Sequence, residues 1–289
     1  MRRWRDAARA SMRLVSERPE LWLPGALAWI ASIGWIPFVV AVARPPSVAE
    51  LTFLGARIVT SGAWPWNAIL IGAGCVSVVV LAFTLSAGAN AALIALLGRR
   101  EASVGDLRRL LAVNLVAALP AALSTLVVLI ALVSVAPREF NAPDPAGGPV
   151  LQTVLRLAPY LTLLVLTAAV GAALSAVAGR LAIRDRYGLT GALRSAPGMA
   201  LRAEIAAHAL ISIVAQVVLL AFATLLLSVL WAPIGAQLAA GGGIDVATGL
   251  LLVGFVAIWL CLVLAGGAVH AWSAATWSRL LATDAPGRT

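Results

Sequence analysis

The chain alternates long apolar runs with short polar segments, and these runs predict its architecture. Six of them reach the roughly 20 residues that a helix needs to cross a bilayer; they cover residues 21–43, 67–97, 110–136, 157–183, 203–231 and 246–272. No segment shows the two-residue alternation of a half-buried strand. We therefore expect an all-α polytopic membrane protein with six transmembrane helices. The expected parts are a cytoplasmic amphipathic N-terminal helix, a transmembrane domain and a cytoplasmic tail, at residues 1–20, 21–282 and 283–289.

Composition agrees with this pattern. Of the 289 residues, 62% are hydrophobic and 11% are charged, whereas a soluble domain carries about 25% charged residues. A water-soluble fold could not bury so much apolar surface. In a soluble protein the net charge of +9 would suggest nucleic acid. Because the arginines flank apolar runs, we interpret them as topology signals and expect no nucleic-acid partner.

The arginines predict the orientation. The N-terminal segment holds six of them, the loop after the second run four, the loop after the fourth run five and the C-terminal tail two, which is 17 of the 21 basic residues. Positive charge gathers on the cytoplasmic side of membrane proteins. We therefore expect a multi-pass protein of the plasma (inner) membrane with both termini in the cytoplasm.

Basic, half-apolar segments precede three of the runs, at residues 6–18, 105–114 and 190–202. In the first, Ala8, Met12 and Val15 are expected on one side of a helix. Such segments are typical of amphipathic helices that lie in the headgroup region. We predict that they lie along the cytoplasmic face, where the arginines that would contact anionic headgroups are Arg9, Arg13, Arg108, Arg109 and Arg194. A further stretch, residues 48–59, could form a short amphipathic helix at the outer interface.

Few ionisable residues fall inside the runs. Glu204 and His208 are four residues apart and share one helical face, and His270 lies near the inner end of the sixth run. They could form a proton relay or a metal site. Alternatively, Glu204 pairs with Arg202 or faces water, and the histidines hydrogen-bond between helices. Two histidines and one glutamate are an incomplete ligand set, so we predict no metal, cofactor or catalytic residue.

Small residues recur every four positions in two runs and predict close helix packing. The positions are Gly171, Ser175 and Gly179 in the fourth run and Gly267 and Ala271 in the sixth. These faces could pack within the bundle or against another protein. The amides Asn90, Asn114 and Gln216 are expected to link helices by hydrogen bonds.

Residues 181–195, with the sequence LAIRDRYGLTGALRS, carry a resemblance. They are similar to an element of uncharacterised prokaryotic six-span membrane proteins, which include the membrane domain of some glycerophosphodiester phosphodiesterases and the YciC-like group. There, an acidic residue and a glycine after one span precede an Ala-Leu-Arg-Ser helix and another span. The resemblance implies a six-span layout. It implies no chemistry, because the phosphodiesterase domain of the fused members has no counterpart here.

Three functions follow from these observations. The leading hypothesis is a non-enzymatic accessory or scaffold protein that packs against other membrane subunits, or against itself, and against anionic lipid. The alternative is a transport subunit such as an ABC-2-type permease, in which residues 98–109 would contact an ATPase. An intramembrane enzyme built on Glu204 and His208 is third. No glycine-rich phosphate loop or nucleophile elbow supports an enzyme.

The first prediction concerns lipid. Replacing Arg9, Arg13, Arg108, Arg109 and Arg194 with glutamine is expected to weaken retention of anionic lipid, because each basic residue near an anionic surface contributes about 1 kcal/mol. Native mass spectrometry of the purified protein measures this, and unchanged lipid retention would reject the headgroup role.

Overall fold

The computed structural model describes residues 2–43, 48–140, 148–183, 188–241 and 245–282, and over these residues it is entirely helical. The expected tail, residues 283–289, lies outside this range. The elements are α1 (Arg2–Glu17), η1 (Pro19–Leu21), α2 (Trp22–Trp29), η2 (Ile30–Gly34), α3 (Ile36–Val42), α4 (Val48–Thr60), α5 (Trp66–Leu97), α6 (Val104–Phe140), α7 (Pro149–Ile183), α8 (Leu189–Ala200), α9 (Ala203–Ala239) and α10 (Val246–Ala282).

Five of these helices, α5, α6, α7, α9 and α10, are long and apolar enough to cross a membrane. The bent pair Pro19–Gly34 and Ile36–Val42 makes a sixth if it is counted as one span. The structure is therefore that of a multi-span helical membrane protein. A side-chain cap marks the start of the last helix. At α10, the Thr248 amide and hydroxyl donate to the Asp245 carboxylate at 2.7 and 2.6 Å, and these bonds hold the pKa of that carboxyl below its ordinary value.

The first apolar run is not one straight helix. Its two parts meet at an angle of 50°, and the π-helical turn η2 precedes the bend. Pro37 has no N–H to donate to the preceding turn, and the Ser32 hydroxyl donates to the carbonyls of Ala28 and Trp29, both at 2.9 Å. Missing and diverted backbone bonds of this kind are the usual causes of a sharp kink.

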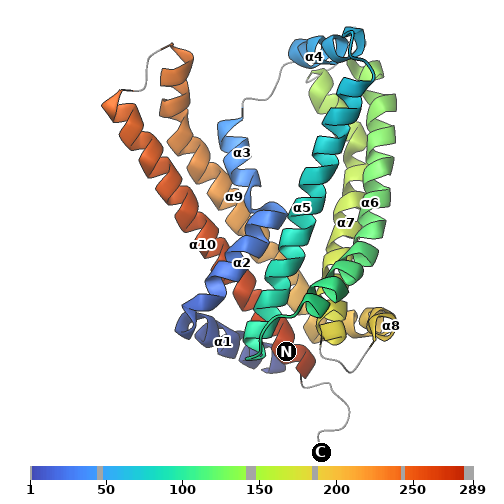
Figure 1. Ribbon diagram of the computed structural model, residues 1–289, viewed down its shortest axis with the longest axis vertical. Coiled ribbons are helices and arrows are strands. Elements are labelled where there is room, and N and C mark those ends of the chain that lie inside the picture. The colour runs from blue at the N-terminus through green and yellow to red at the C-terminus, as the bar shows by residue number, and fades with distance from the viewer. Residues whose placement is uncertain (1, 44–47, 141–147, 184–187, 242–244, 283–289) are drawn as a thin grey trace, which may run out of the picture.

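The spans form two limbs that diverge from a narrow end (Figure 1). One limb consists of α3, α9 and α10, and the other consists of α5, α6 and α7. Within the limbs, α6 packs along α7 and α3 packs on α9, whereas α2 joins the limbs by packing on both α10 and α5. Helices α1 and α8 lie across the narrow end, where α10 also finishes, and α4 lies across the far end of α5. Polar side chains that contact both limbs are therefore expected near the narrow end.

Glycines permit the contact between α2 and α10. A Cβ at Gly25 would collide with the backbone of Gly267, and a Cβ at Gly267 would lie 2.5 Å from the Trp22 carbonyl oxygen. Next to this contact, the ring of Trp29 fits between Gly34 and Gly266, where a Cβ at either glycine would overlap it. Trp29 is 1% exposed. The two backbones thus approach as closely as glycine allows.

The amphipathic segments are helical, with two corrections. Helix α1 buries Ala8, Ser11 and Val15, but Met12, which was expected beside them, is 63% exposed. Residues 105–114 do not form a separate surface helix. They are the first turns of α6, which begins at Val104 with reciprocal bonds between Ser103 and Asp106, each 3.1 Å, as in a capping box.

Helices α4 and α8 match the remaining expectations, since α4 covers residues 48–59 and α8 begins one residue before the expected segment. All five candidate headgroup arginines are exposed. They lie on α1, on the first turns of α6 and on α8, which gather at the narrow end (Figure 1). Their placement is compatible with contact to lipid headgroups, and the contact itself stays a prediction.

The glycine contact generates the second prediction. Gly267→Ala is expected to destabilise the protein by about 1–3 kcal/mol, because the methyl group overpacks a closed backbone contact. Gly254→Ala is the matched control on the same helix. No atom lies within 4 Å of its Cβ position, so it should be neutral or stabilising by up to about 1 kcal/mol. Thermal unfolding in mild detergent measures both, and equal effects would contradict the close-contact interpretation.

Candidate functional site

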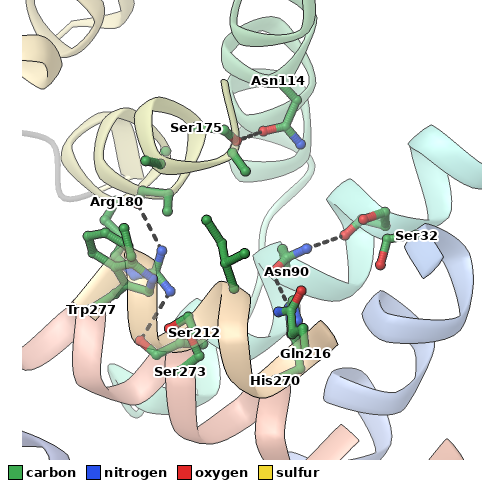
Figure 2. A pocket seen from close by; sticks show the side chains of 18 of the residues that line it. Ser32, Asn90, Asn114, Ser175, Arg180, Ser212, Gln216, His270, Ser273 and Trp277 are labelled. Carbon is green, nitrogen blue, oxygen red and sulfur yellow. Dashed lines mark hydrogen bonds between the residues drawn. The ribbon is translucent and has the colours of Figure 1, made fainter. Parts of the chain in front are cut away.

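A cavity of about 290 Å³ lies where the two limbs meet. It is lined by η2, α5, α6, α7, α9 and α10, so all five long apolar helices contribute to its wall. Figure 2 shows the polar side chains gathered around it, which are Ser32, Asn90, Asn114, Ser175, Arg180, Ser212, Gln216, His270 and Ser273. So many polar groups in otherwise apolar helices make this the candidate functional site.

Arg180 of α7 is buried in the cavity wall, with 6% of its surface exposed. Its guanidinium donates to the Ala176 carbonyl on its own helix at 2.8 Å. It also donates to two groups of α10, the Ala274 carbonyl at 3.1 Å and the Ser278 hydroxyl at 3.2 Å. The planar guanidinium group of Arg180 thus connects α7 to α10 and also contributes to the cavity wall.

The amides connect other helices around the cavity (Figure 2). The Ser175 hydroxyl of α7 donates to the Asn114 side-chain oxygen of α6. His270 of α10 bonds through Nε2 to the Asn90 side-chain oxygen of α5 at 3.0 Å, and the Asn90 amide donates to the Ser86 carbonyl at 2.9 Å. These contacts confirm that Asn90 and Asn114 link helices, while Gln216 lines the cavity.

His208 lies behind the wall and reaches the cavity through serines. Its Nε2 is 3.2 Å from the Ser273 carbonyl oxygen and 3.4 Å from the Ser212 hydroxyl. The Ser212 and Ser273 hydroxyls, 2.9 Å apart, both line the cavity. The ring packs edge-on against Trp277. His208 is fully buried, and its Nδ1 has no partner among the described residues.

The three ionisable residues singled out in the sequence have different contacts. Glu204 lies 4.0 Å from Arg3 of α1, His208 packs against α10, and His270 faces α5. Within the described ranges, no cluster of three histidine, cysteine or carboxylate side chains could hold a metal. A hydrogen-bonding role between helices therefore describes the histidines better than a shared proton relay does.

The small-residue faces pack inside the chain. A Cβ at Gly171 would lie 2.5 Å from the Ala117 carbonyl oxygen of α6, and one at Gly179 would lie 2.6 Å from Leu110 of the same helix. Ala271 is fully buried in a cluster with residues of α1, η1 and α5. The contacts of these faces are therefore with the chain's own helices.

Arg180 is the site residue that sequence reasoning assigned to another role. Its position near the end of an apolar run grouped it with the arginines that set topology. A signal was present, because Arg180 still lies inside that run and directly follows Gly179. The structure shows that the side of α7 carrying Arg180 meets α10, whereas Gly171 and Gly179 meet α6.

Comparison with known proteins leaves identity open. No protein-family model, curated protein or solved structure matches the chain. The six-span resemblance carried by residues 181–195 stays a prediction, and residues 184–187 of that stretch lie outside the described part of the chain.

The third prediction tests Arg180 as a clamp between helices. Arg180→Lys is expected to lower stability by about 1–3 kcal/mol, because one ammonium cannot reproduce the planar fork that reaches both Ala274 and Ser278. Arg156→Lys is the control, since Arg156 is 64% exposed in its pair with Glu139 and exposed pairs contribute about 0–1 kcal/mol. Thermal unfolding in detergent compares the two, and equal losses would argue against the clamp.

Proposed function

We propose that the chain is a transport component that binds a polar substrate in the cavity and moves it across the membrane between the two limbs. The observation that carries the proposal is the polar cavity at the junction of the limbs, to which η2 and five long helices contribute. Polar groups in a membrane interior are costly and often mark substrate pathways. Substrate sites between helical halves that rock against each other are a recurrent transporter design.

The orientation belongs to the same proposal. The bent pair is the first of six spans, and the narrow end faces the cytoplasm. Two observations support this: helix α1 and the end of α10 lie at the same end of the bundle (Figure 1), and the exposed arginines gather there, as the positive-inside tendency requires of a cytoplasmic face.

An accessory or scaffold role is the second candidate. The small-residue faces that first suggested it pack within the chain, so they no longer favour an external partner. A scaffold role would instead use residues 69–81 of α5, which are exposed on all sides and which a second protein would cover in place of lipid. Purification in mild detergent followed by mass spectrometry distinguishes the roles, because a scaffold requires a stoichiometric partner. Contact between residues 98–109 and an ATPase stays a prediction.

The fourth prediction tests the transport path by thiol accessibility. Cys75 and Cys261 are replaced with alanine, and Ser86→Cys places one thiol in the cavity wall. In a transport path, a membrane-impermeant thiol reagent should label this cysteine in both right-side-out and inside-out vesicles, because the cavity opens alternately to each side. The protein is then purified, and the fraction of it that carries the label is measured.

Val80→Cys is the matched control on α5. Val80 is 58% exposed and is turned about 120° from Ser86 by the helical period, so lipid should shield it from the reagent. Labelling of Ser86→Cys from one side only, or from neither side, would contradict the transport proposal.

A further inference from the structure

The cavity wall keeps hydrogen-bonding groups that the fold does not use. The Asn114 side-chain oxygen accepts from Ser175, but the Asn114 amide nitrogen bonds to no described residue. The same holds for the Gln216 side chain and for the Ser86 hydroxyl. All three residues line the cavity, and Figure 2 draws Asn114 and Gln216 in its wall. An unbonded amide or hydroxyl in an apolar interior is costly, and a bound molecule that bonds to these groups would remove that cost.

These three groups lie deep in the bundle. Asn114 is ten residues from the start of α6, Ser86 is eleven residues from the end of α5, and Gln216 is thirteen residues from the start of α9. At 1.5 Å per residue, they lie about 15–20 Å along these helices from the narrow end. The headgroup region of a bilayer is only about 5–8 Å thick on each side. The occupant is therefore a molecule that enters the bundle, and not a headgroup held at its edge.

The chemistry of the wall favours a neutral occupant. Every nitrogen of the Arg180 guanidinium already donates within the protein, to Ser278, Ala176 and Ala274, so an anion would have to displace bonds that hold α7 on α10. The described lining residues include no aspartate or glutamate to pair with a cation. The unused groups are amides and a hydroxyl, which both donate and accept hydrogen bonds. The hydroxyl groups of a ligand can do the same, so the two sets are complementary.

The rest of the wall suits the carbon skeleton of such a ligand. Five alanines of α7 and α9 line the cavity, and they are Ala169, Ala172, Ala173, Ala176 and Ala209. Their short side chains leave room and give C–H groups an apolar surface to pack on. The cavity volume of about 290 Å³ equals the liquid-phase share of about ten waters. A linear five-carbon polyol or a pentose has about ten non-hydrogen atoms, so one such molecule fits.

We propose that the cavity binds a small neutral solute rich in hydroxyl groups, of the size of a five-carbon polyol. The inference rests on the proposed function, because this solute would be the polar substrate that moves between the limbs. Gln216 would bond to it from α9, Asn114 from α6 and Ser86 from α5. Since α9 belongs to one limb and α5 and α6 to the other, the solute would bond across the junction. Its affinity would then depend on how far apart the limbs lie.

The fifth prediction measures binding by the protection of a cavity thiol in the full chain in mild detergent. Cys75 and Cys261 are replaced with alanine, and Ala172→Cys places one thiol in the wall at an exposed position. Saturating xylitol should slow the reaction of this thiol with a water-soluble maleimide at least about tenfold, because the occupied cavity excludes the reagent. Ala206→Cys is the control, since Ala206 is exposed and is not among the described lining residues. Xylitol should leave its labelling rate unchanged, and equal labelling of Ala172→Cys with and without xylitol would overturn the proposal.

Three analogues of xylitol test the class of ligand. They are xylonate, which carries a carboxylate, the 1-amino analogue of xylitol, which carries an ammonium, and pentane-1,5-diol, which lacks three of the hydroxyls. Each should protect Ala172→Cys at least about tenfold less well than xylitol, because an ion must lose its hydration and a missing hydroxyl leaves the wall unbonded. Equal or stronger protection by xylonate would identify an anion site, and by the amine a cation site. Equal protection by the diol would show that the wall does not recognise hydroxyls. Each of these results would overturn the proposal.

Substitutions in the Ala172→Cys background assign the solute to the unused groups. Gln216→Leu removes the amide, so xylitol should protect at least about tenfold less well. Thermal unfolding should show no loss of stability, because Gln216 bonds to no described residue. Thr224→Val is the control on α9, since the Thr224 hydroxyl donates to Leu220 of its own helix. Ser86→Ala should also weaken protection and keeps the test valid if Gln216→Leu does not fold. Full protection in both variants would overturn the proposal.

The two proposals fail separately. Labelling of Ser86→Cys from both sides without protection of Ala172→Cys by xylitol would overturn the ligand class and leave transport standing with another substrate. Protection by xylitol without two-sided labelling would support the binding site and leave it without a path across the membrane.

Discussion

The contact between the backbones of α2 and α10 is the constraint on which the arrangement depends. With Gly25 against Gly267 and the ring of Trp29 between Gly34 and Gly266, the two helices meet at a distance that no larger side chain allows. In lipid, helices associate through such close packing because there is no hydrophobic force to drive them together. The contact fixes α2 against α10 at the narrow end, and the limbs diverge from there.

Helix α10 collects the polar contacts that this geometry makes possible. Arg180 bonds to it from α7, His208 from α9, and Asn90 from α5 through His270. Each interhelical bond of this kind contributes about 0.6 kcal/mol in a membrane protein, so the set stabilises the junction without holding it rigidly. Three helices from both limbs are thereby tied to one helix, and the cavity is the space that remains between them.

How far the sequence predicts this structure depends on whether a feature is local. The spans, the amphipathic character of α1 and α8 and the linking roles of Asn90 and Asn114 follow from hydropathy and residue type. The packing of Trp29 does not, because the slot that accepts its ring is completed by Gly266, more than 200 residues away in the sequence. The role of Arg180 was misassigned for the same reason, since α10 decides whether an arginine at a helix end meets water or a carbonyl. Residues 105–114 were expected to form a separate helix because their composition differs from that of the span. No glycine or proline lies directly after them, so they continue into the rest of α6.

The exposure of residues 69–81 on every side of α5 bears on how this protein can evolve. Where a helix has no neighbour within its own chain, selection for folding acts only on hydrophobicity and helix formation, so valine, leucine, isoleucine and alanine are interchangeable there. At Gly25 and Gly267 the facing backbone leaves room for glycine alone, and at Gly34 and Gly266 the ring of Trp29 does so. Substitutions should therefore be tolerated more readily at the open end of the limbs than at these four glycines.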